Sequence, residues 1–368
     1  MKVFIRPTIA WLSVVLFLVF GASWMSALAS PAVSIGLFAW LFLVIIWVAF
    51  GVVHEAEELA EMLGEPFGTL ILTLSIVLIE VALISAVMIS AQDASTLARD
   101  TMFAVLMIVL NGVVGLGLLI GGARHHEQSY NLQGASAYLA VVIPLSTIAL
   151  VLPKFTASTS DSTLTSLQAT AFSVLTIGLY GIFLWLQTGR HKGFFVEPAN
   201  SDEPVVIEAQ AVSPPLSRRK LIGHVVMLLV NILPIVILSK SLAKVLDHGI
   251  AAMGAPPALG GVVIAMLVFT PEGISALIAI RRNQLTRAIN LCLGGATSTV
   301  GLTVPAVLII GLITGQKVVL GLPPASIVLL AATLILSGLT FSGSRTTMLE
   351  GAVHLSLFAV FLVLVFSP

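Results

Sequence analysis

The chain has 368 residues, of which 58% are hydrophobic and only 9% are charged, and its 17 basic and 17 acidic side chains give a formal net charge of zero. Soluble domains carry about 25% charged residues, so this composition excludes a soluble globular protein, and the balanced charge excludes a nucleic-acid-binding protein. The single cysteine, Cys292, excludes an internal disulfide.

Eleven apolar segments are long enough to cross a lipid bilayer, which takes about 20 residues in a helix. They are 8–28, 31–53, 67–90, 101–122, 134–153, 164–187, 221–246, 258–280, 288–314, 320–341 and 348–367. The first resembles a signal peptide in length, but a second long apolar run follows at once, so we expect a retained helix. The sequence therefore predicts an all-α polytopic membrane protein with about 11 transmembrane helices.

The lysines and arginines predict the orientation of these helices. If the N-terminus is cytoplasmic, 12 of the 17 basic residues fall on the inner side, which is the asymmetry expected of cytoplasmic loops. An odd number of helices then places the C-terminus outside. We expect a multi-pass protein of the cell (inner) membrane with this topology.

The longest polar stretch, 188–220, contains several prolines and charges and no sustained helical period. It is therefore predicted to be a flexible cytoplasmic linker. The resulting division is an N-terminal helix in 1–30, five helices in 31–187, the linker, and five helices in 221–368.

The two groups of five helices share a spacing. Gly68 and Gly260 are each followed twelve residues later by a glutamate, Glu80 and Glu272, in an otherwise uncharged segment. An odd number of helices in each group makes the second copy lie upside down in the membrane. Inverted repeats that meet at the bilayer midplane are typical of secondary transporters, so we expect two inverted five-helix repeats after one extra N-terminal helix.

The two glutamates are the main candidates for a function. A charged carboxylate at the centre of a membrane helix costs about 2.5–3.5 kcal/mol on insertion scales, so each should face the protein interior. Carboxylate oxygens are good ligands for Ca²⁺ and Na⁺, and a low-dielectric site also favours the protonated acid. A site that holds either a cation or protons is the minimum that antiport requires. We therefore predict Glu80 and Glu272 as paired metal and proton ligands.

Neutral oxygens and a helix break are expected near these carboxylates. Pro271 removes a helical hydrogen bond and Gly273 adds backbone freedom, so carbonyls released there could coordinate a cation. The side chains expected to add oxygen ligands are Thr73, Thr270, Asn111, Ser298 and Thr299, with Asn290 as a further candidate. For each of these the alternative, that it only joins helices through hydrogen bonds, stays open.

Two further polar features lie outside this group. In the acidic segment 54–65, a helix would place His54, Glu58, Glu61 and Glu65 on one face, where they could concentrate cations at the inner mouth of a pathway; a solvated interfacial helix is the simpler explanation. Glu350 and His354, four residues apart, could form a polar contact, and we assign them no role in transport.

Several blocks resemble a known family. The run from Gly64 to Val81 resembles the first alpha-repeat of the calcium/proton exchanger family of the cation/calcium exchanger superfamily, and more closely its bacterial sodium-potassium/proton (calcium/proton) antiporter branch. The blocks Pro271–Gly273, Arg287–Leu291 and Gly301–Pro305 resemble the second alpha-repeat. The resemblance covers about residues 31–367.

The resemblance implies an eleven-helix exchanger with a cytoplasmic N-terminus and with Glu80 and Glu272 as central ligands. One feature departs from it. Many calcium exchangers of this superfamily carry an asparagine three residues before each repeat glutamate, whereas this chain has Val77 and Phe269. Neither side chain can coordinate a cation, so the choice between Ca²⁺, Na⁺ and K⁺ stays open.

The sequence thus predicts a secondary active cation/proton antiporter, not an enzyme, that needs no cofactor apart from the transported cation and protons. The alternative is a gated cation channel without proton coupling, and a third option is a membrane-embedded enzyme or scaffold. Proton movement opposite to cation movement would identify the antiporter. The expected partners are inorganic cations, protons and the lipid bilayer; whether the chain forms a homo-oligomer stays open.

Overall fold

The computed structural model describes residues 2–64, 67–90, 94–159, 161–197 and 218–367. The α-helices are α1 (Lys2–Ser26), α2 (Pro31–Leu63), α3 (Phe67–Ser90), α4 (Leu97–Met107), α5 (Val114–His125), α6 (Leu132–Ser146), α7 (Leu152–Phe155), α8 (Ser166–Thr188), α9 (Arg218–Met253), α10 (Ala258–Arg281), α11 (Leu285–Ser298), α12 (Val304–Thr314), α13 (Pro324–Thr340) and α14 (Met348–Phe366). The remaining elements are two 3₁₀ turns, η1 (Ala94–Thr96) and η4 (Lys192–Phe195), three π-helical turns, η2 (Ile108–Val113), η3 (Thr147–Val151) and η5 (Thr299–Thr303), and two short strands, β1 (Gln128–Ser129) and β2 (Arg345–Thr346).

The helical membrane architecture expected from the sequence is confirmed. In the described residues ten helices are long and apolar enough to cross a membrane, and α13 is a shorter apolar helix that makes the eleventh. Three of these membrane helices are composite, because the π-helical turns join α4 to α5, α6 to α7 and α11 to α12 without a loop. The strands β1 and β2 pair antiparallel, with Gln128 opposite Thr346.

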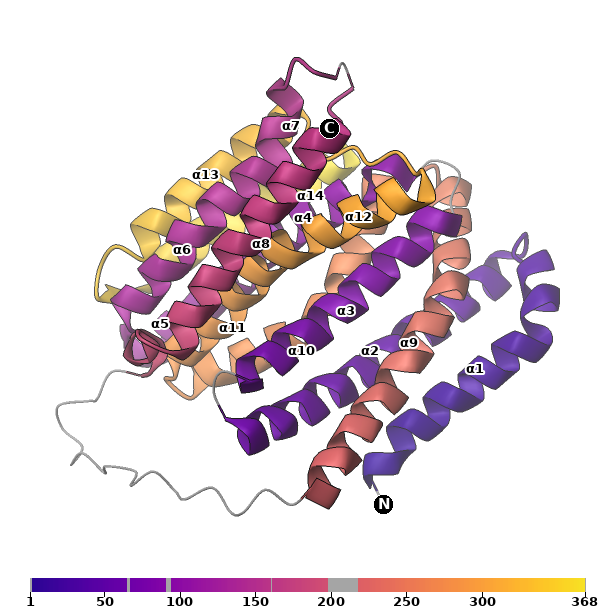
Figure 1. The fold of residues 1–368 in the computed structure, drawn as a ribbon, viewed down its shortest axis with the longest axis horizontal. Helices are drawn as coiled ribbons and strands as arrows, with labels where there is room; N and C mark the ends of the chain where they lie inside the picture. The colour runs from indigo at the N-terminus through magenta and orange to yellow at the C-terminus, as the bar shows by residue number, and fades with distance from the viewer. Residues whose placement is uncertain (1, 65–66, 91–93, 160, 198–217, 368) are drawn as a thin grey trace.

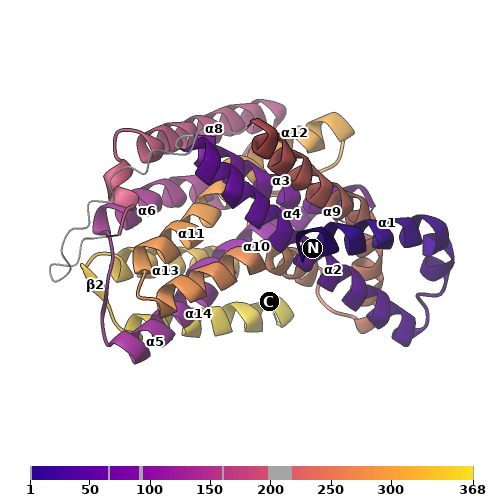
Figure 2. The same ribbon diagram turned by 90° about the horizontal axis from the view of Figure 1, so that it is seen from below.

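The helices form one bundle in which the two termini lie at opposite ends (Figure 1). Helix α9 packs against α1 and α2, and these three form one side of the molecule, as Figure 2 shows from below. Helix α10 lies in the interior, in contact with α4, α5, α11, α2 and α3. The element that carries Glu272 is therefore surrounded by helices from both halves of the chain.

Glycines allow the closest helix contacts in this bundle. A Cβ atom on Gly261 of α10 would lie 2.6 Å from the backbone nitrogen of Thr101 in α4. A Cβ atom on Gly351 of α14 would lie 2.4 Å from the backbone nitrogen of Leu119 in α5. Small residues of this kind are what lets membrane helices approach at backbone distance, and here they hold α4–α5 firmly between α10 and α14.

Two helix boundaries differ from the sequence prediction. Helix α2 continues through most of the acidic segment to Leu63, and Glu55 within it is buried, with its Oε2 2.7 Å from Nδ1 of His224 in α9. Helix α13 begins only at Pro324, because the N–H of Leu322 donates to the carbonyl of Leu150 at 2.9 Å. The backbone just before α13 is thus hydrogen-bonded to the turn η3 and does not extend the helix.

The predicted flexible linker 188–220 is ordered at both of its ends. Helix α8 ends at Thr188 and α9 already begins at Arg218. Between them, residues 189–197 include η4 and pack against the bundle, with the amide of Asn131 donating to the carbonyls of Gly193 and Val196 at 3.0 and 3.2 Å. Residues 198–217 of the predicted linker lie outside the described residues.

Candidate cation and proton site

Glu80 lies in α3 and is completely buried. Its Oε2 accepts two hydrogen bonds, from the hydroxyl of Thr299 at 3.0 Å and from that of Thr303 at 2.8 Å. Both threonines belong to the π-helical turn η5, where four residues of separation place them on one face. Hydroxyl donors of this kind stabilise the carboxylate form of a buried acid.

Glu272 lies in α10 and is 6% exposed. It sits beside helix α11, because a Cβ atom on Gly295 would come within 3.1 Å of Glu272 Oε2 and 2.7 Å of the ring of Phe269. The expected helix break at Pro271 and Gly273 is not present, since α10 runs through both as one helix. A proline removes only one helical hydrogen bond, and Gly273 is buried against Val113, where its missing side chain serves close packing.

Each glutamate has a buried carboxyl oxygen without a hydrogen-bond partner among the described residues. Among the residues that the structure describes, Glu80 Oε1 and Glu272 Oε2 are buried and have no hydrogen-bond partner. The two carboxyl groups are also close enough for their charges to interact. Two buried, mutually repelling carboxylates with unpaired oxygens are costly in a low-dielectric interior. The arrangement therefore favours a state in which protons or a bound cation complete these oxygens.

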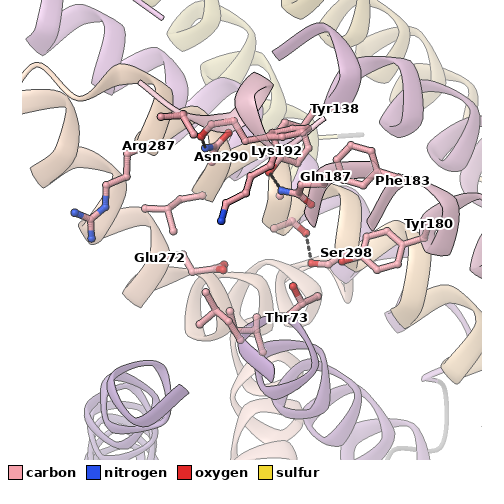
Figure 3. Close-up of a pocket in the computed structure, with 17 residues that line it drawn as sticks. Thr73, Tyr138, Tyr180, Phe183, Gln187, Lys192, Glu272, Arg287, Asn290 and Ser298 are labelled. Carbon is pink, nitrogen blue, oxygen red and sulfur yellow. Dashed lines mark hydrogen bonds between the residues drawn. The ribbon is translucent and has the colours of Figure 1, made fainter. Parts of the chain in front are cut away.

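A cavity of about 290 Å³ reaches Glu272. Helices α3, α6, α8, α10 and α11 and the segment 189–197 supply its walls, and Figure 3 shows the polar side chains that line it. Its polar lining consists of Thr73, Tyr138, Tyr180, Gln187, Lys192, Glu272, Arg287, Asn290 and Ser298. Glu80 is not part of this lining. In this conformation one carboxyl group is therefore accessible from the cavity and the other is sealed.

The structure brings several of the predicted ligands together. Thr73 and Ser298 line the cavity with Glu272, and Thr299 holds Glu80. Asn290 also lines the cavity, and its amide donates to the carbonyl of Phe195 at 2.7 Å, so it joins α11 to the segment 189–197.

Two predicted ligands lie apart from this group. The hydroxyl of Thr270 donates to the carbonyl of Met266 in its own helix at 2.5 Å, and Thr270 does not line the cavity. The amide nitrogen of Asn111 donates to Thr333 at 2.7 Å, and its oxygen is 3.1 Å from Nδ1 of His354. In this conformation Asn111 joins helices through hydrogen bonds, which is the alternative that the sequence left open, whereas the hydroxyl of Thr270 bonds within its own helix.

His354 and Glu350 have separate partners rather than each other. His354 is fully buried, and its Nε2 lies 3.0 Å from the hydroxyl of Thr340. Glu350 caps the start of α14, where its Oε2 accepts the N–H of Thr347 at 2.9 Å. The polar contact that the sequence suggested between them is thus replaced by two local networks.

Sequence reasoning missed two parts of the site. Thr303 holds Glu80 as closely as Thr299 does, and its position four residues after Thr299 was the available signal. The segment 189–197 was missed although Phe194 and Phe195, the only aromatic residues of the predicted linker 188–220, were the available signal. In the described residues no group of three or more His, Cys, Asp or Glu side chains is placed to hold a metal ion.

The comparisons with known proteins agree with this architecture. The model of the sodium/calcium exchanger protein family matches residues 33–189 and 223–367. The chain belongs to this family. The two matched blocks contain one site glutamate each and exclude α1 and most of the segment between α8 and α9.

Two bacterial relatives are similar to this chain over most of its length. The protein y4hA of Sinorhizobium fredii, named as an ionic transporter, is 40% identical over 323 residues, which are 87% of this chain and 85% of that protein. The sodium-potassium/proton antiporter ChaA of Escherichia coli is 38% identical over 359 residues, which are 96% of this chain and 93% of ChaA.

Solved structures share the exchanger fold at low sequence identity. The Ca²⁺/H⁺ antiporter protein YfkE superposes with a TM-score of 0.73 at 17% identity, and the match covers 100% of both chains. The H⁺/Ca²⁺ exchanger CAX superposes with a TM-score of 0.64 at 15% identity, covering 98% of this chain and 89% of CAX.

The exchanger fold places apolar side chains at the two positions where the sequence departs from calcium exchangers. Val77 and Phe269 are both buried, 7% and 3% exposed. Each lies about one helical turn before its glutamate, and the ring of Phe269 packs against Gly295 beside Glu272. The neutral oxygens around Glu80 come instead from Thr299 and Thr303.

Proposed function

We propose that this member of the exchanger family is a secondary active antiporter that moves an inorganic cation across the cell membrane in exchange for protons. The observation that carries the proposal is the pair of buried carboxyl groups, Glu80 and Glu272, each with one oxygen left unpaired by the described residues. The printed function of ChaA, sodium-potassium/proton antiport, supports the same activity. The gated-channel alternative receives no support from these relatives.

The coupling follows from the cost of an empty site. When both carboxyl groups are protonated, the site is neutral and the proton on each group satisfies an oxygen. When a cation enters from the cavity, it binds Glu272 and displaces protons to the same side. A state with neither ligand leaves buried carboxylates uncompensated, which is unfavourable. The protein therefore changes conformation with protons or with a cation, and rarely with neither.

Alternating access requires a second conformation that opens toward the other side. The conformation described here opens Glu272 to the cavity and encloses Glu80 between α3 and the turn η5. A separate cavity of about 280 Å³ lies beside Arg99, Asp100 and the C-terminal part of α14. We propose that this second cavity, lined by α4, α10 and α14, marks the position of the opposite opening.

The orientation of the bundle is part of the proposal. The cavity at Glu272 is bordered by the segment that follows α8, and the end of α8 lies at the same end of the bundle as the N-terminus (Figure 1). With the cytoplasmic N-terminus that the basic residues favour, the present conformation opens inward. The two halves, 31–187 and 221–368, are then inverted five-helix repeats with α1 as the extra helix.

The test is proton flux in sealed proteoliposomes that contain the purified protein. We expect Na⁺, K⁺ or Ca²⁺ added on one side to drive protons in the opposite direction, and the substitutions Glu80→Gln and Glu272→Gln to abolish this flux. Glu127→Gln is the control, because Glu127 is an exposed partner of Arg345 remote from the site. Cation flux without proton counter-flux would refute antiport in favour of a channel.

A further inference from the structure

The segment 189–197, which we term the strap, is fixed across the mouth of the Glu272 cavity. The amides of Asn131 and Asn290 hold three of its carbonyl groups at 2.7–3.2 Å. Glu197 at its end accepts the backbone N–H of Thr286 at 3.4 Å, at the start of α11. A Cβ atom on Gly134 would lie 2.3 Å from the carbonyl oxygen of Phe194, so α6 and the strap touch at backbone distance.

The strap places one positive charge inside a cavity that leads to a carboxylate. Lys192 lines the same cavity as Glu272, and Figure 3 shows its ammonium group pointing into that space. Among the described residues no carboxylate oxygen lies within 4.0 Å of this ammonium group. The other cationic lining residue, Arg287, points away from the cavity in the same view and interacts electrostatically with Glu57.

We propose that Lys192 is a selectivity-determining residue whose fixed charge in the cavity favours monovalent over divalent cations. This inference rests on the proposed cation/proton exchange, and it names the preferred substrate class of that site as a monovalent metal ion. It is independent of the missing asparagines at Val77 and Phe269, because it concerns the path to Glu272 and not the ligands around it.

The physical reason is the dependence of electrostatic energy on ionic charge. A fixed positive charge raises the energy of a nearby cation in proportion to that cation's charge. If Lys192 weakens the binding of a monovalent ion by a factor f, it weakens the binding of a divalent ion at the same place by f². The relation holds whatever the distance and the effective dielectric constant, so it gives a quantitative signature of an electrostatic role.

The strap makes the charge effective. A lysine on a free loop would move its ammonium group into bulk solvent and away from the ion path. Here the backbone just after Lys192 is held by hydrogen bonds from Asn131 and Asn290, and the backbone N–H of Lys192 donates to the carbonyl of Gly189 at 3.3 Å, so the lysine stays in the wall of the cavity. Because Lys192 is exposed to solvent, added salt should screen its charge and weaken the effect.

The experiment measures the half-saturating concentrations of Na⁺, K⁺ and Ca²⁺ for proton flux in proteoliposomes at low ionic strength and at alkaline pH, where protons compete least. Each ion is also scored as an inhibitor of flux driven by the others. The variants are Lys192→Gln, Lys192→Arg and Arg190→Gln. Arg190 is the matched control, because it is exposed two residues away and does not line the cavity.

We expect Lys192→Gln to lower the half-saturating concentration about threefold for Na⁺ and K⁺, a modest value for one solvated charge, and therefore about ninefold for Ca²⁺. Lys192→Arg should restore wild-type values, and Arg190→Gln should not change them. Added inert salt should reduce all the differences.

Equal shifts for monovalent and divalent ions in Lys192→Gln, or no shift in either, would overturn the proposal. So would a changed Ca²⁺ to Na⁺ ratio in Arg190→Gln that matches the ratio in Lys192→Gln. Failure of the underlying function looks different, because wild-type protein would then show no cation-driven proton flux at all.

Discussion

A single added methyl group beside Glu272 provides a sharp test of the site geometry. A Cβ atom on Gly295 would lie 2.7 Å from the ring carbon Cε2 of Phe269 and 3.1 Å from Glu272 Oε2. Carbon atoms pack at about 3.5–4.0 Å, so the substitution Gly295→Ala forces the ring or the carboxyl group to move. Overpacking of this kind costs about 1–3 kcal/mol, of which the better helix propensity of alanine offsets about 1 kcal/mol.

The expected result is a small loss of stability and a larger loss of function. We expect Gly295→Ala to raise the half-saturating cation concentration about tenfold, which corresponds to about 1.4 kcal/mol, because the added methyl group displaces the carboxyl group of Glu272, the proposed cation ligand, or the Phe269 ring packed beside it. The assays are cation-driven proton flux in proteoliposomes and thermal unfolding in detergent.

The matched control is Gly178→Ala in the middle of α8, where nothing lies within 4 Å of the added carbon. This variant should transport normally and unfold at the wild-type temperature or slightly above it. If Gly295→Ala behaves like Gly178→Ala in both assays, the packing of α11 against Glu272 is not as described, and the cavity geometry argued from it is wrong.

Three further substitutions test the surrounding contacts. Thr303→Val should weaken apparent cation affinity tenfold or more in the flux assay, because a hydrogen bond to a carboxylate contributes about 1.5–3 kcal/mol; Thr303→Ser should retain affinity, and equal behaviour of the two would contradict a role for the hydroxyl at Glu80. Partial burial at the start of α11 raises the pKa of Glu197 above its usual value, so the stability it contributes is present at low pH and is lost as pH rises through the folded-state pKa; Glu197→Gln should therefore unfold at a slightly higher temperature than wild type at pH 8, a small difference because the side chain is largely exposed, and that difference should vanish toward pH 4, whereas a constant difference would refute this account. His354→Leu should lower the unfolding temperature, because each buried partner left unpaired costs about 1–3 kcal/mol, whereas unchanged stability would show that the network around His354 is not formed.

The parts of this protein that could be predicted from the sequence are those set by the bilayer. The apolar runs predicted the helices because a membrane helix must be about 20 residues long and satisfy its own backbone. Glu80 and Glu272 were predictable as functional candidates because a carboxylate costs free energy in that environment regardless of its neighbours.

The rest depended on contacts between distant segments. Thr303 bonds Glu80 across more than two hundred residues of sequence. The strap is held by Asn131 and Asn290, and the sequence of the strap does not indicate either partner. Helix α10 stays continuous at Pro271 because the surrounding helices pack it, although the local sequence favours a break. In each case tertiary packing decided the outcome, and one sequence gives no measure of packing.

The helix formed by α11, η5 and α12 touches both glutamates. Its first part lines the cavity beside Glu272, and its π-helical turn carries the two hydroxyls that hold Glu80. A π-helical turn contains one more residue than an α-helical turn, and each residue of an α-helix turns the chain by about 100°. Moving that extra residue along the helix by one position would therefore change which side chains face Glu80. The α11 residues that form the cavity wall beside Glu272 would keep their orientation. The exchange of ligands at the two carboxyl groups can thus be linked through the winding of a single helix, without any loop between them.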